Sequence, residues 1–341
     1  MSIDVLEPVV RSRRRRRRYR LRRLVPVVVL ALAAFGGGIL LGARGSGSAA
    51  QASSADSPAA ASTTPAAASS TTPSAPKTKP LPAVAPLLHG PATLAGRLNA
   101  PLAAASAIVV DADTGQVLWT KNAHTRRPVA STTKIMTALL AMRVLKPSDL
   151  VRVDPSVTRV PLVREGLRAN EIVPSWKLFD AMLLYSGNDD ALALAIAAGG
   201  TRQAFLKEMN AEAERLHLTD THFTSPSGVI DKGNYSTAYD LAALTRYALR
   251  SPRFRRIVRT EIVHVTWAAP TYSKIYVNNN SLLKLYPGAN GVKTGFTHAA
   301  GWCLVSSATR HGRTLIAVVL NSGDMYNDSK KLLDLGFRNP A

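Results

Sequence analysis

Apolar and polar residues follow two patterns along the chain, and each pattern predicts a different kind of element. Apolar runs at 107–110 and 117–120 flank a segment with the composition of a tight turn, which predicts a β-hairpin. Apolar residues then recur at helical spacing and predict helices at 131–145, 175–183, 189–198, 202–216 and 238–249. Short strands return at 262–267, 273–277, 291–297, 301–309 and 314–320, before a last helix at 328–335.

Strands at both ends with helices between them predict an α/β (α+β) fold, in which an antiparallel sheet is built from both ends of one domain. The chain has 341 residues, of which 46% are hydrophobic, which is enough for a large core. We expect this folded domain to cover residues 95–341, with no second domain.

The N-terminal residues differ sharply from the rest in charge and hydrophobicity. The formal net charge is +21, and the Arg-rich segment 1–23 accounts for +8 of it. Residues 24–43 carry no charge and would span about 30 Å as a helix, which matches a bilayer core. Arginines on the N-terminal side place that end in the cytoplasm and everything after residue 43 outside. They therefore indicate membrane topology, and we expect no nucleic-acid partner.

The segment 24–43 is either a retained transmembrane signal-anchor or a cleaved signal peptide, since Ala50-Gln51-Ala52 resembles a cleavage site. Residues 44–94, rich in Ala, Ser, Thr and Pro, predict a disordered linker. We expect a single-pass protein of the cell membrane with an extracytoplasmic domain, or a secreted protein if the signal is cleaved. Cys303 is the only cysteine and lies in an apolar strand pattern, which favours a role in core packing.

The segment Ser131-Thr132-Thr133-Lys134 begins the first predicted helix and places a serine and a lysine three residues apart. Residues at that spacing lie on one face of a helix, so the lysine amine can reach the serine hydroxyl. Such a pair can supply a nucleophile and its base. A serine at this position can instead cap the helix, and the motif alone leaves both interpretations open.

Two further motifs follow. Ser186-Gly187-Asn188 separates two predicted helices, where a polar helix cap is the structural alternative, and Lys293-Thr294-Gly295 lies in a predicted strand, where a polar strand end is the alternative. With these three motifs in order, the chain resembles the serine D-alanyl-D-alanine carboxypeptidases, low-molecular-mass penicillin-binding proteins of the β-lactamase/transpeptidase-like superfamily. The resemblance covers about residues 95–338 and includes the segments 209–211, 221–223, 236–241 and 291–297.

The resemblance implies a five-stranded sheet flanked by helices, with a helical subdomain, and it implies a role for each motif. Ser131 would be the nucleophile and Lys134 its base, while Ser186 would pass a proton to the leaving nitrogen. A neutral Lys134 requires burial and a second cation nearby, for which Lys293 is the candidate. The oxyanion would be held by the backbone N–H groups of Ser131 and Phe296. The implied substrate-binding residues are Asn188, Lys293, Thr294, Gly295, Phe296 and Thr297.

The implied substrate is a peptidoglycan stem peptide ending in D-Ala-D-Ala, so that the protein would act in cell-wall (peptidoglycan) biosynthesis and in cell shape. β-Lactams would be covalent inhibitors, and no metal or cofactor is expected. The chain has Gly187 where β-lactamases often carry Asp, and Glu165 does not match the acidic loop that class A β-lactamases use for deacylation. We therefore expect penicillin to acylate Ser131 and remain there.

Other interpretations stay open on the sequence. The same site would also suit a D,D-endopeptidase or a β-lactamase, and a non-catalytic cell-wall-binding protein could retain the fold. Some relatives place an arginine before the last helix to bind the substrate carboxylate, whereas residues 322–327 contain none. The hydroxyls of Thr294 and Thr297 are the expected substitutes. Asp189-Asp190 fits helix N-terminal charge better than a catalytic pair, and His124, His222 and His298 show no metal-ligand spacing.

Overall fold

The structure, a computed structural model, describes residues 82, 84–98, 100–229, 232–266 and 273–339. The predicted segments 1–23 and 24–43, and most of the predicted linker 44–94, lie outside these residues. Among the helices of the described ranges, none combines the length and the apolar character needed to cross a membrane.

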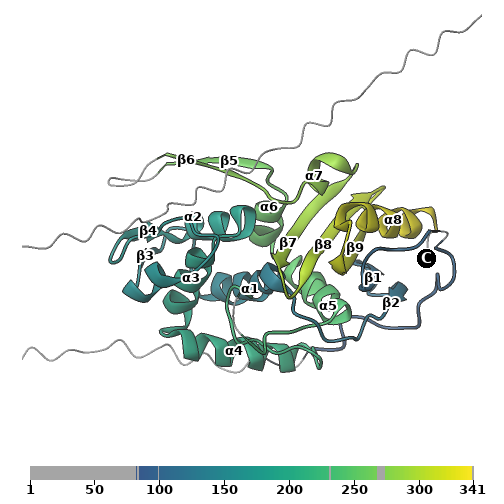
Figure 1. The fold of residues 1–341 in the computed structure, drawn as a ribbon, viewed down its shortest axis with the longest axis horizontal. Coiled ribbons are helices and arrows are strands. Elements are labelled where there is room, and N and C mark those ends of the chain that lie inside the picture. Colours follow the sequence, from purple (N-terminus) through teal and green to yellow (C-terminus); the bar gives the residue numbers. More distant parts are fainter. Residues whose placement is uncertain (1–81, 83, 99, 230–231, 267–272, 340–341) are drawn as a thin grey trace, which may run out of the picture. The chain divides into compact units, whose positions relative to one another are not determined.

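Five antiparallel strands form the central sheet, in the order β2-β1-β9-β8-β7 (Figure 1). β1 and β2 are the predicted first hairpin, and β1 pairs with β9, which joins the two ends of the domain. The expected α/β (α+β) fold, with a five-stranded antiparallel sheet built from both chain ends, is confirmed. The strands are β1 (Ser106–Asp111), β2 (Val117–Lys121), β7 (Ala289–Thr297), β8 (Gly301–Arg310) and β9 (Arg313–Ser322).

Helices cover both faces of the sheet. Alternate residues of β1 enter different hydrophobic clusters, Ala107 and Val109 on one face and Ile108 and Val110 on the other. α8 (Met325–Arg338) packs on the first face and α5 (Ala238–Ala248) on the second (Figure 1). The central strands are consequently buried on both sides, which explains their nearly continuous apolar sequences.

A helical part packs beside the sheet. α1 (Lys134–Val144) contacts α3 (Asn188–Gly199), and α3 in turn contacts α2 (Ser175–Asp180) and α4 (Arg202–Arg215). α3 is buried on nearly all sides because its sequence is almost wholly Ala, Leu and Ile after its first turn. The π-helical turn η3 (Ala181–Tyr185) extends α2 toward the start of α3. The first residues of α1 and α3 thereby meet beside β7.

The remaining elements are short. β3 (Leu150–Arg152) pairs with β4 (Ile172–Pro174), and β5 (Ile262–Val265) pairs with β6 (Lys274–Val277), each as a separate two-stranded ribbon. Three helices were not predicted because none is longer than seven residues, too short to display helical periodicity: η2 (Pro155–Arg159), α6 (Pro252–Val258) and α7 (Leu282–Leu285).

Residues 84–94, which the sequence assigns to the end of the linker, pack against the domain. Leu87 and Leu88 are 4% and 2% exposed and belong to the main hydrophobic core. The N–H of Leu94 donates to the Leu118 carbonyl at 2.7 Å. The packed region therefore extends N-terminal to the predicted boundary at residue 95.

Candidate active site

The nucleophile candidate lies in a tight turn before α1. Ser131 is inside the 3-10 turn η1 (Ala130–Thr133), and neither η1 nor α1 has a side-chain cap. The capping interpretation of Ser131 is therefore wrong. Ala130 has φ 48°, a left-handed conformation that costs a non-glycine residue about 1–2 kcal/mol. The turn presents Ser131, 7% exposed, to a cavity.

The Lys134 amine lies within hydrogen-bond distance of several groups of the site. Its Nζ lies 2.8 Å from Ser131 Oγ, 2.7 Å from Asn188 Oδ1 and 3.5 Å from Ser186 Oγ. The Ser227 carbonyl oxygen is 3.3 Å away. Lys134 is fully buried. Residues of the first and second motifs therefore lie together around one amine.

Burial controls the charge of this amine. Burial, and then the nearby Lys293 charge, lower the pKa of Lys134 well below its ordinary 10.5, while Asp190 and Asp189 oppose the change. Burial also lowers the pKa of Lys293 to about 7. Lys134 is therefore buried and has a second amine nearby, and this Lys293 amine is only partly protonated near pH 7.

The second motif is held by its backbone. Ser186 has φ 75° and ends η3, and Asn188 begins α3. The Asn188 N–H donates to the Val163 carbonyl at 2.9 Å, and its Nδ2 donates to the Pro161 carbonyl at 3.2 Å. Because Nδ2 is engaged there, Oδ1 faces Lys134. A Cβ on Gly187 would lie 1.9 Å from Asp190 Oδ2, so a larger residue here would displace this buried carboxyl.

The third motif belongs to β7, the edge strand of the sheet. Lys293 is buried, and its Nζ donates to the Thr294 carbonyl at 3.0 Å. Gly295 permits close packing, since a Cβ there would lie 3.0 Å from the Ser131 backbone nitrogen. Thr297 does not line the cavity, and its Oγ1 accepts the Ala300 N–H at 3.0 Å in the turn after β7. Of the two hydroxyls expected to bind the substrate carboxylate, only Thr294 faces the cavity.

The cavity has a volume of about 570 Å³, well within the range of ligand sites. Ser131 and Ser186 line it from one side and β7 from another. Phe296 and Trp302 are 44% and 48% exposed, with ring centroids 4.4 Å apart, and they form an apolar wall. The complete lining is Ser131, Val163, Ser186, Asn279, Thr294, Gly295, Phe296, Trp302, Gly323, Asp324, Met325 and Tyr326.

Sequence reasoning missed a buried ionic network behind the second motif. Lys177 and Tyr276 donate to the Glu165 carboxylate, and Lys274 Nζ donates to it at 2.9 Å. Glu165 and Lys177 are at most 2% exposed. Although burial opposes ionisation of Glu165, its polar and cationic partners lower its pKa. Burial, and then the Glu165 charge, raise the pKa of Asp190 well above 3.8, which favours the neutral form of this buried carboxyl.

This network fixes the loop 161–167 at the cavity. Asp189 accepts the N–H groups of Glu165 and Gly166 at 2.9 and 2.8 Å. The loop in turn supplies the carbonyls that orient Asn188. Asp189 and Asp190 do lie in the first turn of α3, as expected. The sequence does not reveal that Asp189 accepts backbone N–H groups of the loop, or that the pKa of Asp190 is raised. No single-sequence signal connects Glu165 with Lys274, which is 109 positions away.

The segment Ser225–Gly228 is a second missed component. A Cβ on Gly228 would lie 2.0 Å from the Ala130 carbonyl oxygen, and Gly228 has φ +74°. Thr137 Oγ1 donates to the Pro226 carbonyl at 2.6 Å. This segment supports η1 and the start of α1 from behind. Ser227 and Gly228 lie in a polar loop of the sequence, where only the Pro and Gly residues mark a specific backbone path.

Within the described ranges, no three His, Cys, Asp or Glu side chains are placed to hold a metal ion. Cys303 is buried in β8, which agrees with the predicted packing role, and burial raises the pKa of its thiol to about 11.

Comparisons with known proteins agree with this geometry. The D-alanyl-D-alanine carboxypeptidase family, Peptidase_S11, matches residues 95–324. DacF of Bacillus subtilis is 35% identical over 243 residues, which span 69% of this chain and 62% of that relative. DacB2 of Mycobacterium tuberculosis is 37% identical over 238 residues, 67% of this chain and 81% of the relative. Both are named D-alanyl-D-alanine carboxypeptidases.

The crystal structure of the Streptomyces K15 DD-transpeptidase has a TM-score of 0.67 to this fold at 34% identity. The match covers 70% of this chain and 99% of the Streptomyces chain. The sequence motifs, the fold and these relatives agree, and the chain belongs to the D-alanyl-D-alanine carboxypeptidase family of serine hydrolases.

Proposed function

We propose that this protein removes the terminal D-Ala from peptidoglycan stem peptides ending in D-Ala-D-Ala, through an acyl-enzyme on Ser131. The observation that carries the proposal is the 2.8 Å contact between Ser131 Oγ and a buried Lys134 amine whose pKa is lowered. The lowered pKa favours the neutral amine, which can accept the hydroxyl proton, whereas an ammonium cannot.

The chemistry proceeds in two halves. Lys134 Nζ takes the Ser131 proton as Oγ forms a bond to the carbonyl carbon between the two alanines. The backbone N–H groups of Ser131 and Phe296 hold the resulting oxyanion. The carbon–nitrogen bond then breaks as Ser186, 3.5 Å from Lys134 Nζ, passes a proton to the leaving amine. In the second half, water attacks the ester and gives a proton to Lys134, which returns it to Ser131 Oγ as the ester bond breaks.

Substrate binding follows from the position of β7. An edge strand has free backbone groups, and an extended peptide can add alongside residues Thr294–Phe296. Asn188 would bind a substrate amide through its side chain. Thr294 and the buried Lys293 cation lie where the terminal carboxylate would be bound, whereas Thr297 contributes less, because its hydroxyl oxygen already accepts a bond in the turn after β7.

β-Lactams would acylate the same serine and remain attached. Rapid hydrolysis requires a carboxylate that activates water beside the ester. Glu165, a carboxylate close to the cavity in sequence and space, is buried and already accepts from Lys177, Lys274 and Tyr276. It is therefore not available as a base for deacylation.

The same proposal includes location. The uncharged segment 24–43 after the arginine block 1–23 would anchor the protein in the cell membrane, with the catalytic domain outside, unless cleavage releases it. Fractionation of cells into membrane and medium, combined with N-terminal sequencing of the mature protein, distinguishes anchoring from secretion. Recovery in the soluble cytoplasmic fraction would contradict both forms.

The main test is covalent labelling. Purified protein incubated with fluorescent penicillin should acquire one label, and Ser131→Ala should acquire none. Ser281→Ala, which changes an exposed serine before α7, is the matched control and should label normally. Release of D-Ala from a pentapeptide should fall at least about a thousandfold in Ser131→Ala. Normal labelling of Ser131→Ala would overturn the assignment.

Two alternatives predict different substrates. One relative, from Escherichia coli, is named a D-alanyl-D-alanine endopeptidase and is 32% identical over 228 residues. An endopeptidase would cleave a cross-linked peptide dimer faster than the pentapeptide, so both substrates should be assayed together. A non-catalytic wall-binding protein would cleave neither, and the intact Ser131–Lys134 contact argues against it.

A further inference from the structure

A second cavity, of about 600 Å³, lies at the opposite end of the sheet from Ser131. The candidate active site uses the end of β7 and the start of β8. The second cavity uses the start of β7 at Asn290, the end of β8 at Thr309 and the start of β9 at Thr314. Because these strands are antiparallel, the two cavities are separated by the length of the strands.

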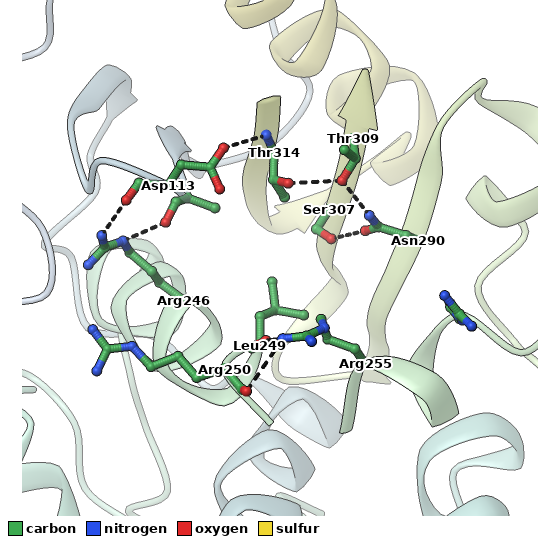
Figure 2. Close-up of a pocket in the computed structure, with 11 residues that line it drawn as sticks. Asp113, Arg246, Leu249, Arg250, Arg255, Asn290, Ser307, Thr309 and Thr314 are labelled. Carbon is green, nitrogen blue, oxygen red and sulfur yellow. Dashed lines mark hydrogen bonds between the residues drawn. The ribbon is translucent and has the colours of Figure 1, made fainter. Parts of the chain in front are cut away.

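One wall of this cavity is cationic, formed by the end of α5 and by α6 (Figure 2). Asp113 is the single acidic residue among the described residues of the lining, and its Oδ2 accepts the Thr314 N–H at 2.9 Å. In the part of the chain that the structure describes, no carboxylate forms an ion pair with the arginines of this wall. They are Arg246, Arg250, Arg255 and Arg259.

Neutral backbone groups hold two of these guanidinium groups in place. Arg246 donates to the carbonyls of Ala112, Asp113 and Leu87 at 2.7, 2.8 and 2.9 Å. Arg255 Nη1 donates to the Leu249 carbonyl at 2.6 Å. A carbonyl fixes a cation without neutralising it. The cavity therefore keeps a positive charge, and the Arg250 charge lowers the pKa of Arg246 in addition to the larger effect of burial.

The facing wall is neutral and rich in hydroxyl groups. Asn290 Nδ2 donates to Thr309 Oγ1 at 2.8 Å, and Thr309 Oγ1 lies 2.9 Å from Thr314 Oγ1. The buried Ser307 hydroxyl donates to Asn290 Oδ1. Figure 2 shows this network along one side of the cavity, with Arg246, Arg250 and Arg255 along the other. Hydroxyl groups of a ligand would find both donors and acceptors here.

We propose that this cavity binds the phosphate ester of a polyol or sugar, with the phosphate on the arginine wall and the polyol hydroxyls on the Asn290–Thr314 wall. Guanidinium groups match the geometry and charge of phosphate oxygens. The described lining contains no aromatic side chain on which a nucleobase could stack, which favours a polyol over a nucleotide. The proposal does not depend on acyl transfer at Ser131.

Calorimetric titration of the full-length protein with sn-glycerol 3-phosphate, inorganic phosphate and polyglycerol phosphate tests the proposal. Glycerol 3-phosphate should bind at least tenfold more tightly than inorganic phosphate. The double variant Arg250→Gln/Arg259→Gln changes two exposed side chains and should weaken binding at least tenfold. Arg152→Gln, an exposed arginine on β3, removes the same kind of charge and should bind as the unmutated protein does. Penicillin labelling of all variants should be unchanged, which verifies folding.

The polyol part has its own variant. Thr309→Val removes a hydroxyl from the network and should weaken glycerol 3-phosphate binding while leaving inorganic phosphate unaffected. If the polymer binds more tightly than glycerol 3-phosphate and is sensitive to the same variants, the ligand comes from a phosphodiester polymer. If glycerol 3-phosphate binds more tightly than the polymer, the ligand is a small metabolite. Equal affinity for inorganic phosphate and glycerol phosphate, or binding that survives Arg250→Gln/Arg259→Gln, would overturn the proposal.

Discussion

Glu165→Gln removes one buried negative charge with almost no change of side-chain size. The substitution removes the carboxylate that accepts from the fully buried Lys177, and Asp190, 4.0 Å away, is then the nearest carboxyl group that forms an ion pair with it. Lys274 is 31% exposed and can recover hydration from water, so its loss is small. The Gln oxygen can still accept from Tyr276. The destabilisation therefore comes mainly from the weaker ion pairing of the buried Lys177 charge.

The expected loss of folding stability in Glu165→Gln follows from the burial of Lys177. Breaking a buried ion pair by removing one partner costs about 3–5 kcal/mol. In a domain of this size, such a loss lowers the thermal midpoint by about 6–20 °C. Because the pKa of Glu165 is lowered to about 2 in the folded state, its stabilisation is complete above the ordinary 4.5 and is lost progressively as pH falls from 4.5 toward 2. The difference between mutant and unmutated protein should therefore narrow in acid.

Thermal unfolding followed by circular dichroism at pH 7 and pH 4 measures both effects. Glu214→Gln, on the exposed face of α4, removes the same charge and serves as the control, with a midpoint expected within about 2 °C of the unmutated protein. We also expect slower penicillin acylation in Glu165→Gln, because the loop that orients Asn188 loses its anchor. An unchanged midpoint at pH 7 would refute the structural role of this network.

Three further substitutions or treatments have defined outcomes. Asp190→Asn should leave stability at pH 7 unchanged or increased, because burial and Glu165 raise the pKa of this carboxyl; a thermal midpoint lowered by more than about 5 °C would contradict this. Gly228→Ala should abolish penicillin labelling, since the new Cβ would lie 2.0 Å from a carbonyl oxygen of η1, whereas Gly312→Ala, with no atom within 4 Å, should label normally. Cys303 should resist a thiol reagent at pH 8 and react once after unfolding, because it is buried with a pKa of about 11; reaction in the folded protein would disprove this.

Local signals in the sequence account for most of the predicted elements. The helix predicted at 238–249 begins directly after Thr237, a residue type that commonly caps helices, and its side chain accepts the Asp240 N–H at 3.0 Å at the start of α5. The same kind of signal precedes α6, where Ser251 caps the helix and Pro252 follows it, but that helix was missed. A helix of seven residues is too short to show a periodic apolar face, so the capping residues alone did not predict it.

The predicted site residues come together because the first two motifs lie at the starts of α1 and α3, while the third lies within β7 beside them. What the sequence could not supply is the set of contacts between distant segments. Gly187 was identified only as a departure from β-lactamases, and its cause is the Asp190 carboxyl packed against it. The charge of Glu165 acts on that carboxyl from a segment for which the sequence predicts neither helix nor strand. Pairing of this kind depends on tertiary packing, which single-sequence periodicity does not encode.

The active site is assembled at a cost to stability, and Lys293 makes that cost measurable. Lys134 and Lys293 are buried amines, while Ala130 and Ser186 have left-handed backbone, and all four lie around Ser131. The side chain of Lys293 has one hydrogen-bond acceptor among the described residues, the carbonyl of the next residue. Lys293→Met should therefore raise the thermal midpoint while reducing penicillin acylation at least about a hundredfold. A lowered midpoint would mean that the Lys293 charge stabilises the fold. The loss of folding stability would then have to come from Lys134, Ala130 or Ser186 instead.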